Sequence, residues 1–143
     1  MITPYADSVH RSQVVALWEQ VFGYEAPHNR PSIAIDKKLA ADDQLFFVAL
    51  SENAVVGTVM AGYDGHRGWI YSVAVAPSHR RQGLGSRLVR HAERALAGKG
   101  CVKINLQILE ANESVVSFYA KLGYIVEKRV SMGKRIPENV PAG

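Results

Sequence analysis

The spacing of apolar residues along the chain predicts where its helices lie. A first helix is predicted, begun by Asp7 or Ser8. The buried face of this helix holds Val14, Leu17, Trp18, Val21 and Phe22. A turn-rich loop over residues 23–31 comes next, and a shorter helix follows it around Ile35 and Leu39. A long helix begins near residue 84, and its apolar stripe is formed by Leu84, Leu88, Val89, Ala92, Ala95 and Leu96.

Alternating or continuous apolar runs predict the strands. After a short initial strand, residues 45–50 and 55–63 form a hairpin, and residues 69–76 extend it. Residues 102–108 alternate between apolar and polar side chains, which predicts a strand with one buried face. A last strand is expected from about Tyr124. This order of elements predicts an α/β fold in which much of the sheet is antiparallel.

Bulk properties limit the class of protein. With 143 residues, 48% of them hydrophobic, we expect a single domain over residues 1–143 with a real core. The apolar runs are too short to cross a bilayer, and no secretory signal is visible. The single cysteine, Cys101, excludes an internal disulfide. We therefore expect a cytoplasmic protein without membrane association. The five histidines have no metal-ligand spacing, and we expect no metal.

The stretch from Val73 to Ser86 carries the strongest chemical signal. It predicts a buried strand, a basic turn and two glycines, Gly83 and Gly85, at the start of a helix. The first N–H groups of a helix lack internal partners, and the helix dipole makes that end positive. Glycines let a ligand approach these groups closely. The sequence therefore predicts an anion site, with diphosphate as its natural occupant.

The distribution of charge agrees with this prediction. The formal net charge is +4, from 17 Lys and Arg against 13 Asp and Glu. The densest basic cluster is His79, Arg80 and Arg81 with Arg87 and Arg90, around the predicted anion site. Other basic residues are spread along the chain. A phosphate-rich cofactor explains this pattern without nucleic acid.

Spacing distinguishes between the known phosphate-binding motifs. No Gly-Lys-Ser/Thr of a P-loop occurs, and Leu88 stands where a dinucleotide fingerprint needs its third glycine or alanine. The pattern Arg80-x-x-Gly83-x-Gly85 instead resembles the [QR]-x-x-G-x-[GA] signature of the GNAT superfamily of N-acetyltransferases. Downstream, the segment from Asn112 to Tyr124 resembles that family's N-x-x-[AV]-x-x-[FL]-Y-x-x-x-G-[FY] pattern. Two motifs in order are more specific than either alone.

The resemblance implies a fold, a cosubstrate and a binding site. The implied fold is a mixed, largely antiparallel sheet flanked by helices, with two strands splayed apart where acetyl-CoA lies. The pantetheine arm would pair with the main chain of the 69–76 strand, and the diphosphate would meet the N–H groups of the glycine turn. The implied acetyl-CoA contacts are Val73, Ala74, Val75, Arg80, Arg81, Gln82, Gly83, Leu84, Gly85, Ser86, Asn112 and Tyr119.

The same resemblance implies catalytic roles. Tyr119 matches the family's general acid, which protonates the leaving thiolate, although it also fits the apolar stripe of its own helix. The acceptor amine must be neutral in order to attack, so a base or a water relay is useful. Tyr71 and Glu110 are the first candidates for that base, and Asp64 and Glu25 are weaker ones. Each also has an ordinary structural or solvated interpretation.

Three functional classes remain open at this stage. The first is an acetyl-CoA-dependent acetyltransferase acting on a small-molecule amine or on a peptide or protein amine. The second is a non-catalytic module that binds acyl-CoA, against which an intact Tyr119 argues mildly. The third is a nucleic-acid binder that uses Arg80 and Arg81, which predicts strongly salt-dependent DNA affinity. The sequence favours the first class and gives neither the acceptor nor the oligomeric state.

Overall fold

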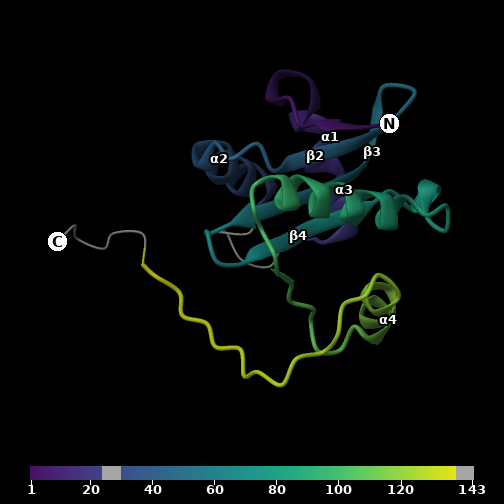
Figure 1. Ribbon diagram of the computed structural model, residues 1–143. Coiled ribbons are helices and arrows are strands. Elements are labelled where there is room, and N and C mark those ends of the chain that lie inside the picture. The colour runs from purple at the N-terminus through teal and green to yellow at the C-terminus, as the bar shows by residue number, and fades with distance from the viewer. Residues whose placement is uncertain (24–29, 138–143) are drawn as a thin grey trace. The chain divides into compact units, whose positions relative to one another are not determined.

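A computed structural model describes residues 1–23 and 30–137 of the chain (Figure 1). The chain forms two compact units, Met1–Gln107 and Ile108–Gly143. The first contains the sheet and most of the helices, and the second contains one helix.

The first unit is built on a five-stranded sheet whose order follows the sequence. Antiparallel pairing joins β1 (Ile2–Pro4), β2 (Phe46–Ser51), β3 (Ala54–Tyr63) and β4 (Gly68–Val75). The last strand, β5 (Ile104–Asn105), pairs with β4 in parallel. The sheet is thus mixed and largely antiparallel, as predicted.

Three α-helices of this unit pack on the sheet. They are α1 (Asp7–Val21), α2 (Pro31–Ala41) and α3 (Leu84–Gly98). Figure 1 shows α3 in front of the sheet, with α1 and α2 behind it. None of the helices in residues 1–23 and 30–137 is long and apolar enough to cross a membrane.

Neighbouring residues of β3 show that α1 and α3 cover opposite faces. A Cβ added to Gly57 would meet Leu88 Cδ1 of α3 at 2.8 Å. The next residue, Thr58, contacts Trp18 of α1 instead. Successive strand residues point to opposite faces, so the two helices sandwich the sheet. Both layers of the core are fully apolar apart from Thr58 and a few side chains at the edges of α1 and α2.

Three details of the predicted helices are wrong. The N-cap of α1 is Ala6, and Asp7 instead forms an ion pair with Arg11 in the first turn. Phe22 lies just beyond α1 and is half-exposed. In α2 the buried side chain beside Ile35 is Lys38, because a nearby carboxylate and a carbonyl satisfy its ammonium group.

The predicted strand over residues 102–108 is also too long. Only Ile104 and Asn105 pair with β4, and Val102 is 93% exposed. The prediction of a strand with one buried face thus holds only for two residues, because an alternating pattern does not specify a partner strand.

The second unit contains α4 (Glu113–Lys121). The helix stops as predicted at Gly123, whose φ is +97°, where the N–H of Tyr124 donates to the Tyr119 carbonyl. The strand predicted from Tyr124 is absent from residues 124–137. A tight turn, in which the Arg129 N–H donates to the Glu127 carbonyl at 2.9 Å, interrupts that segment.

Candidate functional site

A β-bulge divides β4 into two parts. Thr58 of β3 lies opposite Ala74 and Met60 lies opposite Tyr71, so Ser72 and Val73 together face one residue of β3. Ser72 adopts a left-handed conformation, with φ +53°. A bulge of this kind reverses which way the following residues point and occurs often beside active sites.

A buried hydrogen-bond chain holds the bulge in place. The Trp18 Nε1–H donates to Thr58 Oγ1 at 2.8 Å, and the Thr58 hydroxyl donates to the Ser72 carbonyl at 2.9 Å. Thr58 is fully buried. Sequence reasoning missed this chain, although a lone hydroxyl in an apolar strand and an indole on an apolar helix face both need partners.

The last residues of β4 present an open main-chain edge. The N–H of Ala76 donates to the Val56 carbonyl of β3. Main-chain groups of adjacent residues point in opposite directions, so those of Val75 and Val73 face away from β3. The β4–β5 ladder contains only Gly68 and Trp69 of β4, so no strand within the described ranges covers this edge. Val73 and Val75 are the residues predicted to meet the pantetheine arm.

The turn after β4 forms the start of α3. A 3-10 turn, η2 (Pro77–His79), leads to Arg81 and Gly83, which are both left-handed, with φ +63° and +76°. Gly83 is the N-cap of α3, and no side chain caps the helix. The N–H groups of the first turn, at Leu84, Gly85 and Ser86, are therefore available to an anion. A Cβ on Gly83 would have nothing within 4 Å, so the space before these groups is open.

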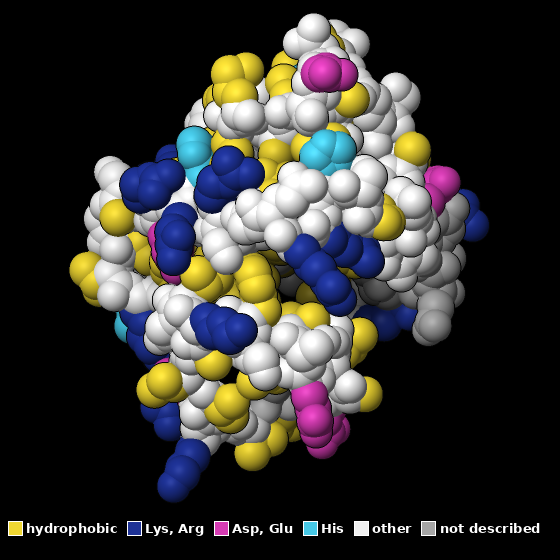
Figure 2. Space-filling model, turned by 90° about the vertical axis from the view of Figure 1, so that its right-hand side faces the viewer, with side chains coloured by type: hydrophobic (Ala, Val, Ile, Leu, Met, Phe, Trp, Pro, Cys, Tyr) yellow, Lys and Arg dark blue, Asp and Glu magenta, His cyan; other side chains and the backbone are white. Residues whose placement is uncertain are grey.

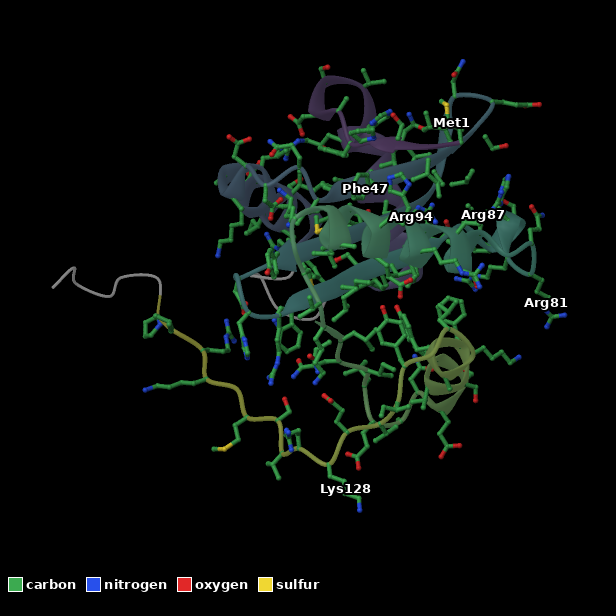
Figure 3. The ribbon with its side chains drawn as sticks, in the orientation of Figure 1. Met1, Phe47, Arg81, Arg87, Arg94 and Lys128 are labelled. Carbon is green, nitrogen blue, oxygen red and sulfur yellow. The ribbon has the colours of Figure 1, made fainter. Side chains whose placement is uncertain are left out.

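The basic residues of this turn are arranged differently from one another. Arg80 Nε–H donates to the Val75 carbonyl at 3.3 Å, which joins the turn to the open edge of β4. Arg81 is exposed at the tip of the turn and points away from α3 (Figure 3). Gln82 is exposed beside it. The face of the molecule where α3 begins carries many Lys and Arg side chains and few acidic ones (Figure 2).

Tyr71, a predicted base, lies on the α1–α2 face of the sheet before the bulge. Its side chain is 42% exposed, and Lys38 Nζ lies 5.4 Å from the centre of its ring. Lys38 is itself buried and donates to Asp43 Oδ2 at 2.8 Å and to the Ala61 carbonyl. A buried lysine beside Tyr71 had no signal in the sequence.

Of the two weaker base candidates, the structure describes Asp64 and gives it a structural role. Asp64 Oδ1 accepts the N–H groups of His66 and Arg67, both at 2.7 Å, and these hydrogen bonds lower the pKa of the carboxyl. Asp64 thus closes the β3–β4 turn. Glu25 lies outside the described residues.

The remaining predicted residues belong to the second unit. Tyr119 of α4 is buried, and its ring meets Phe118 and Tyr124 edge-on. Burial raises the pKa of Tyr119 to about 12, so its hydroxyl is protonated at neutral pH. Asn112 occupies the N-cap of α4, but its side chain accepts from the Ser114 hydroxyl and not from a main-chain N–H, which corrects the predicted cap. Glu110 is exposed before this helix.

The donor set suits a diphosphate better than a metal. Main-chain N–H groups and arginines bind anions, whereas cations need carboxylate, imidazole or thiolate ligands. Among the residues that the structure describes, no group of three or more His, Cys, Asp or Glu side chains is arranged to hold a metal ion.

Comparison with known proteins agrees with this geometry. Residues 12–124 match the acetyltransferase (GNAT) family. An acetyltransferase of Yersinia enterocolitica is 40% identical over 124 residues, which are 87% of this chain and 87% of that protein.

Solved structures share the fold. Ard1 from Thermoplasma volcanium superposes with a TM-score of 0.76 at 20% identity, over 89% of this chain and 83% of that one. Aminoglycoside N-acetyltransferase AAC(6')-Iy, solved in complex with CoA, gives a TM-score of 0.77 at 19% identity, over 94% and 93% of the two chains. The family match covers both predicted motifs, and we conclude that this chain belongs to the acetyltransferase (GNAT) family.

Proposed function

We propose that the protein transfers an acetyl group from acetyl-CoA to a primary amine, which attacks the thioester directly in a ternary complex. The observation that carries this proposal is the uncapped start of α3 directly after the bulged end of β4, which pairs with β3 on one side and has no partner strand among the described residues on the other. The first feature suits a diphosphate, and the second suits an extended amide-bearing arm. The two units would act as one domain over residues 1–143.

In this proposal the binding residues follow the order of the chain. The N–H groups from Arg81 to Ser86, with Arg80, Gln82, Gly83, Leu84 and Gly85 in the same turn, hold the diphosphate. Val73 and Val75 pair with the pantetheine arm as an added strand would. Asn112 and Tyr119 contribute from the second unit. When bound, acetyl-CoA supplies the activated acetyl thioester.

The bulge would supply an oxyanion donor. Attack forms the C–N bond and places negative charge on the carbonyl oxygen before the C–S bond breaks. The N–H of Val73, at the bulge, would donate to that oxygen, whereas Ala74, the other predicted donor, lies opposite Thr58 and faces β3. Because main-chain groups held by a sheet need no reorganisation during the reaction, this donor is well suited to stabilise a transient charge.

Two protons must move in the proposed reaction. The amine loses one, to Tyr71, to Glu110 or to water that one of them orients. The leaving thiolate gains the other, from the hydroxyl of Tyr119, the predicted general acid, or from water. A phenol of pKa about 12 is a weaker acid than a thiol of pKa about 8.5, so Tyr119 acts mainly as a hydrogen-bond donor to the developing thiolate. Its contribution should be about 100-fold or less.

The acceptor is an amine of unknown structure. The aminoglycoside N-acetyltransferase among the structural neighbours shows only that this fold is compatible with an amine acceptor. A small-molecule amine and a peptide or protein amine both fit the proposal.

The test is release of free thiol from acetyl-CoA in the presence of small amines, amino acids and peptides. We expect CoA to raise the melting temperature and at least one amine class to increase thiol release. CoA binding without thiol release for any amine class would favour the non-catalytic acyl-CoA module. Steep, salt-dependent DNA binding without a CoA shift would favour the nucleic-acid binder.

A further inference from the structure

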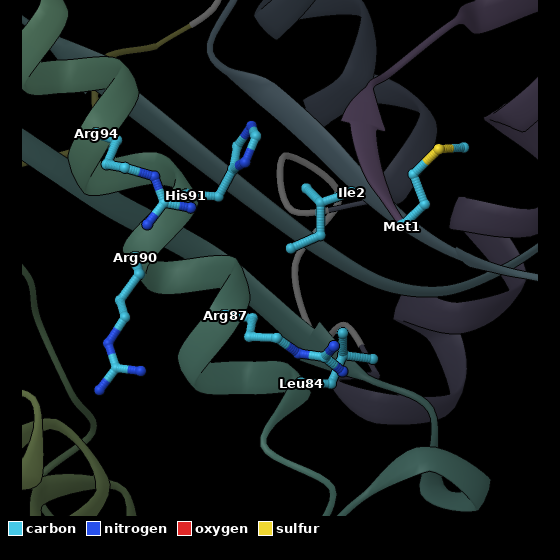
Figure 4. A pocket seen from close by; sticks show the side chains of 7 residues that line it. All are labelled: Met1, Ile2, Leu84, Arg87, Arg90, His91 and Arg94. Carbon is cyan, nitrogen blue, oxygen red and sulfur yellow. The ribbon is translucent and has the colours of Figure 1, made fainter.

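A second basic site lies between α3 and β1 in the first unit. A cavity of about 450 Å³ opens there, with Ile2 and Leu84 as apolar side chains and Arg87, His91 and Arg94 as basic ones (Figure 4). We call it the α3–β1 groove. Its volume lies within the usual range of small-ligand pockets.

The basic side chains of the groove form a stripe along α3. Positions 87, 91 and 94 follow each other at intervals of four and three residues, so they share one helix face. Figure 4 shows them on the side of α3 that faces Ile2. A helix rises 1.5 Å per residue, so the main-chain positions of Arg87 and Arg94 are about 10 Å apart along α3. Their long side chains can therefore reach the same ligand.

Within the described part of the chain, the arginines of the groove form no ion pair with an acidic side chain. The ion pairs in residues 1–23 and 30–137 involve Arg11 and Lys38, and none involves Arg87, Arg90 or Arg94. Unpaired guanidinium groups around an apolar floor suit phosphate, which Arg binds in a bidentate manner.

The groove is distinct from the proposed acetyl-CoA site. The open edge of β4 faces away from β3, whereas the groove lies beside β1, at the other end of the strand order. Leu84 belongs to both sites, with its main-chain N–H in one and its side chain in the other, and Arg87 and Arg90 of the groove follow the diphosphate turn along α3, so the two sites are neighbours.

The pKa of His91 can report on an anion bound in the groove. The centre of the His91 ring lies 4.5 Å from the centre of the Phe47 ring, and the two rings pack edge-on. Burial, together with the charge of Arg94, lowers the pKa of His91. The charged groups of the groove are Arg87, Arg90 and Arg94 of the same helix and the amino group of Met1, which donates to the Leu50 carbonyl, while Ile2 of β1 and Phe47 of β2 contribute apolar side chains. An anion in the groove would favour the protonated imidazole and raise that pKa.

We propose that the α3–β1 groove binds a small phosphorylated organic anion, with Arg87 and Arg94 on its phosphate and the apolar floor against its carbon body. Binding here does not depend on acetyl transfer.

The test is an NMR titration of the His91 imidazole with inorganic pyrophosphate and with glycerol 3-phosphate, at saturating CoA. We expect each probe to raise the pKa of His91 by about half a unit or more, with the ring assigned from the His91→Gln variant. The double variant Arg87→Gln/Arg94→Gln should need at least a 10-fold higher probe concentration for the same rise in the pKa of His91. The matched control Arg30→Gln/Arg67→Gln removes the same net charge elsewhere and should keep the wild-type response.

Four outcomes would overturn the proposal. The first is an unchanged His91 pKa with both probes. The second is an equal loss of response in both double variants, which would indicate a general effect of net charge. The third is a response that appears only without CoA, which would assign the groove to the coenzyme. The fourth is tighter binding of a DNA duplex than of either probe, which would indicate that the groove binds nucleic acid and not a small ligand.

Discussion

The first residues of β4 are paired and packed, whereas its last residues are open. At the first end, Gly68 donates its N–H to the Lys103 carbonyl next to β5, and a Cβ there would lie 2.7 Å from Cys101 Sγ. At the other end, Val75 lies opposite Gly57 of β3, and no strand in the described ranges pairs with β4 on its other side. The bulge at Ser72 separates the two ends.

This contrast shows how one strand can serve both stability and chemistry. Pairing on both sides at the first end, and with β3 at the second end, fixes β4 in the sheet, so the second end can leave one edge without a partner strand and not fray. Substitutions near Gly68 should therefore change the free energy of unfolding, and substitutions near Val75 and Gly83 should change coenzyme binding.

The largest expected effect is at the turn that follows the open end. Gly83→Glu places a carboxylate beside the proposed diphosphate site, and like charges in contact cost several kcal/mol. CoA affinity, measured by calorimetry, should fall at least about 100-fold. The matched control is Gly65→Glu, since Gly65 also has a positive φ and open space but lies in the β3–β4 turn. Equal affinity in the two variants would reject the site.

At the paired end, Gly68→Ala should reduce stability. Its Cβ would meet Cys101 Sγ at 2.7 Å and Leu96 Cδ1 at 3.0 Å, and overpacking of this kind costs about 1–3 kcal/mol. Gly62→Ala on β3 is the control, since its nearest contacts are at 3.9 Å. Urea unfolding measures both. CoA affinity of the folded Gly68→Ala protein should not change, and a large loss would contradict the division between the two ends.

The hydrogen-bond chain behind the bulge should affect both properties. Thr58→Val leaves the Trp18 indole N–H and the Ser72 carbonyl without their partner, at a cost of about 1–3 kcal/mol. A displaced bulge should also lower kcat about 10-fold with little change in KM for acetyl-CoA. Thr58→Ser keeps the hydroxyl and should restore kcat. A purely structural role predicts that kcat of the folded variant stays normal.

Tyr119→Phe supplies a reference outside β4. It should lower kcat by about 10-fold while CoA affinity and unfolding stay close to wild type. Because the pKa of Tyr119 is raised to about 12, its hydroxyl stays protonated over the usual assay range. The pH–rate profile should therefore show no loss of activity from this group below about pH 11. A wild-type kcat in this variant would reject the proposed role of Tyr119 as an acid.

The smallest effect is expected for Arg81→Gly. Arg81 has φ +63°, which glycine adopts without strain, so relief of strain and the entropy of glycine should nearly cancel in stability. Removal of an exposed charge should weaken CoA binding only about 2- to 5-fold at low salt. The difference should disappear at high salt, because mobile ions screen exposed charges. A loss that persists in salt would instead indicate that the loop changes shape.

Local signals predicted the start of α3 better than they predicted the strands at the edge of the sheet. The Arg80-x-x-Gly83-x-Gly85 pattern predicted the uncapped start of α3, because the helix start and the left-handed glycine are local properties. The apolar periods placed α1, α3 and the hairpin for the same reason. The strand after Tyr124 was predicted wrongly, because pairing depends on a partner that an apolar pattern does not specify.

The bulge and its support could not be read from the sequence. Ser72 and Val73 look like ordinary strand residues, and their conformation follows from the register against β3 and from the Thr58 hydroxyl. Burial of Lys38 likewise needs Asp43 and the Ala61 carbonyl close together, which only the packing of α2 on the sheet provides.

The sequence by itself determined most of the helices, the β2–β3–β4 strands, the glycine turn before α3 and the family motifs, since periodicity and glycine placement act over a few residues. Tertiary structure alone decided which edge of β4 stays open, where the bulge reverses it, and which arginines of α3 converge on a groove beside β1. These features arise from contacts between residues that are distant in the chain, and no local pattern records them.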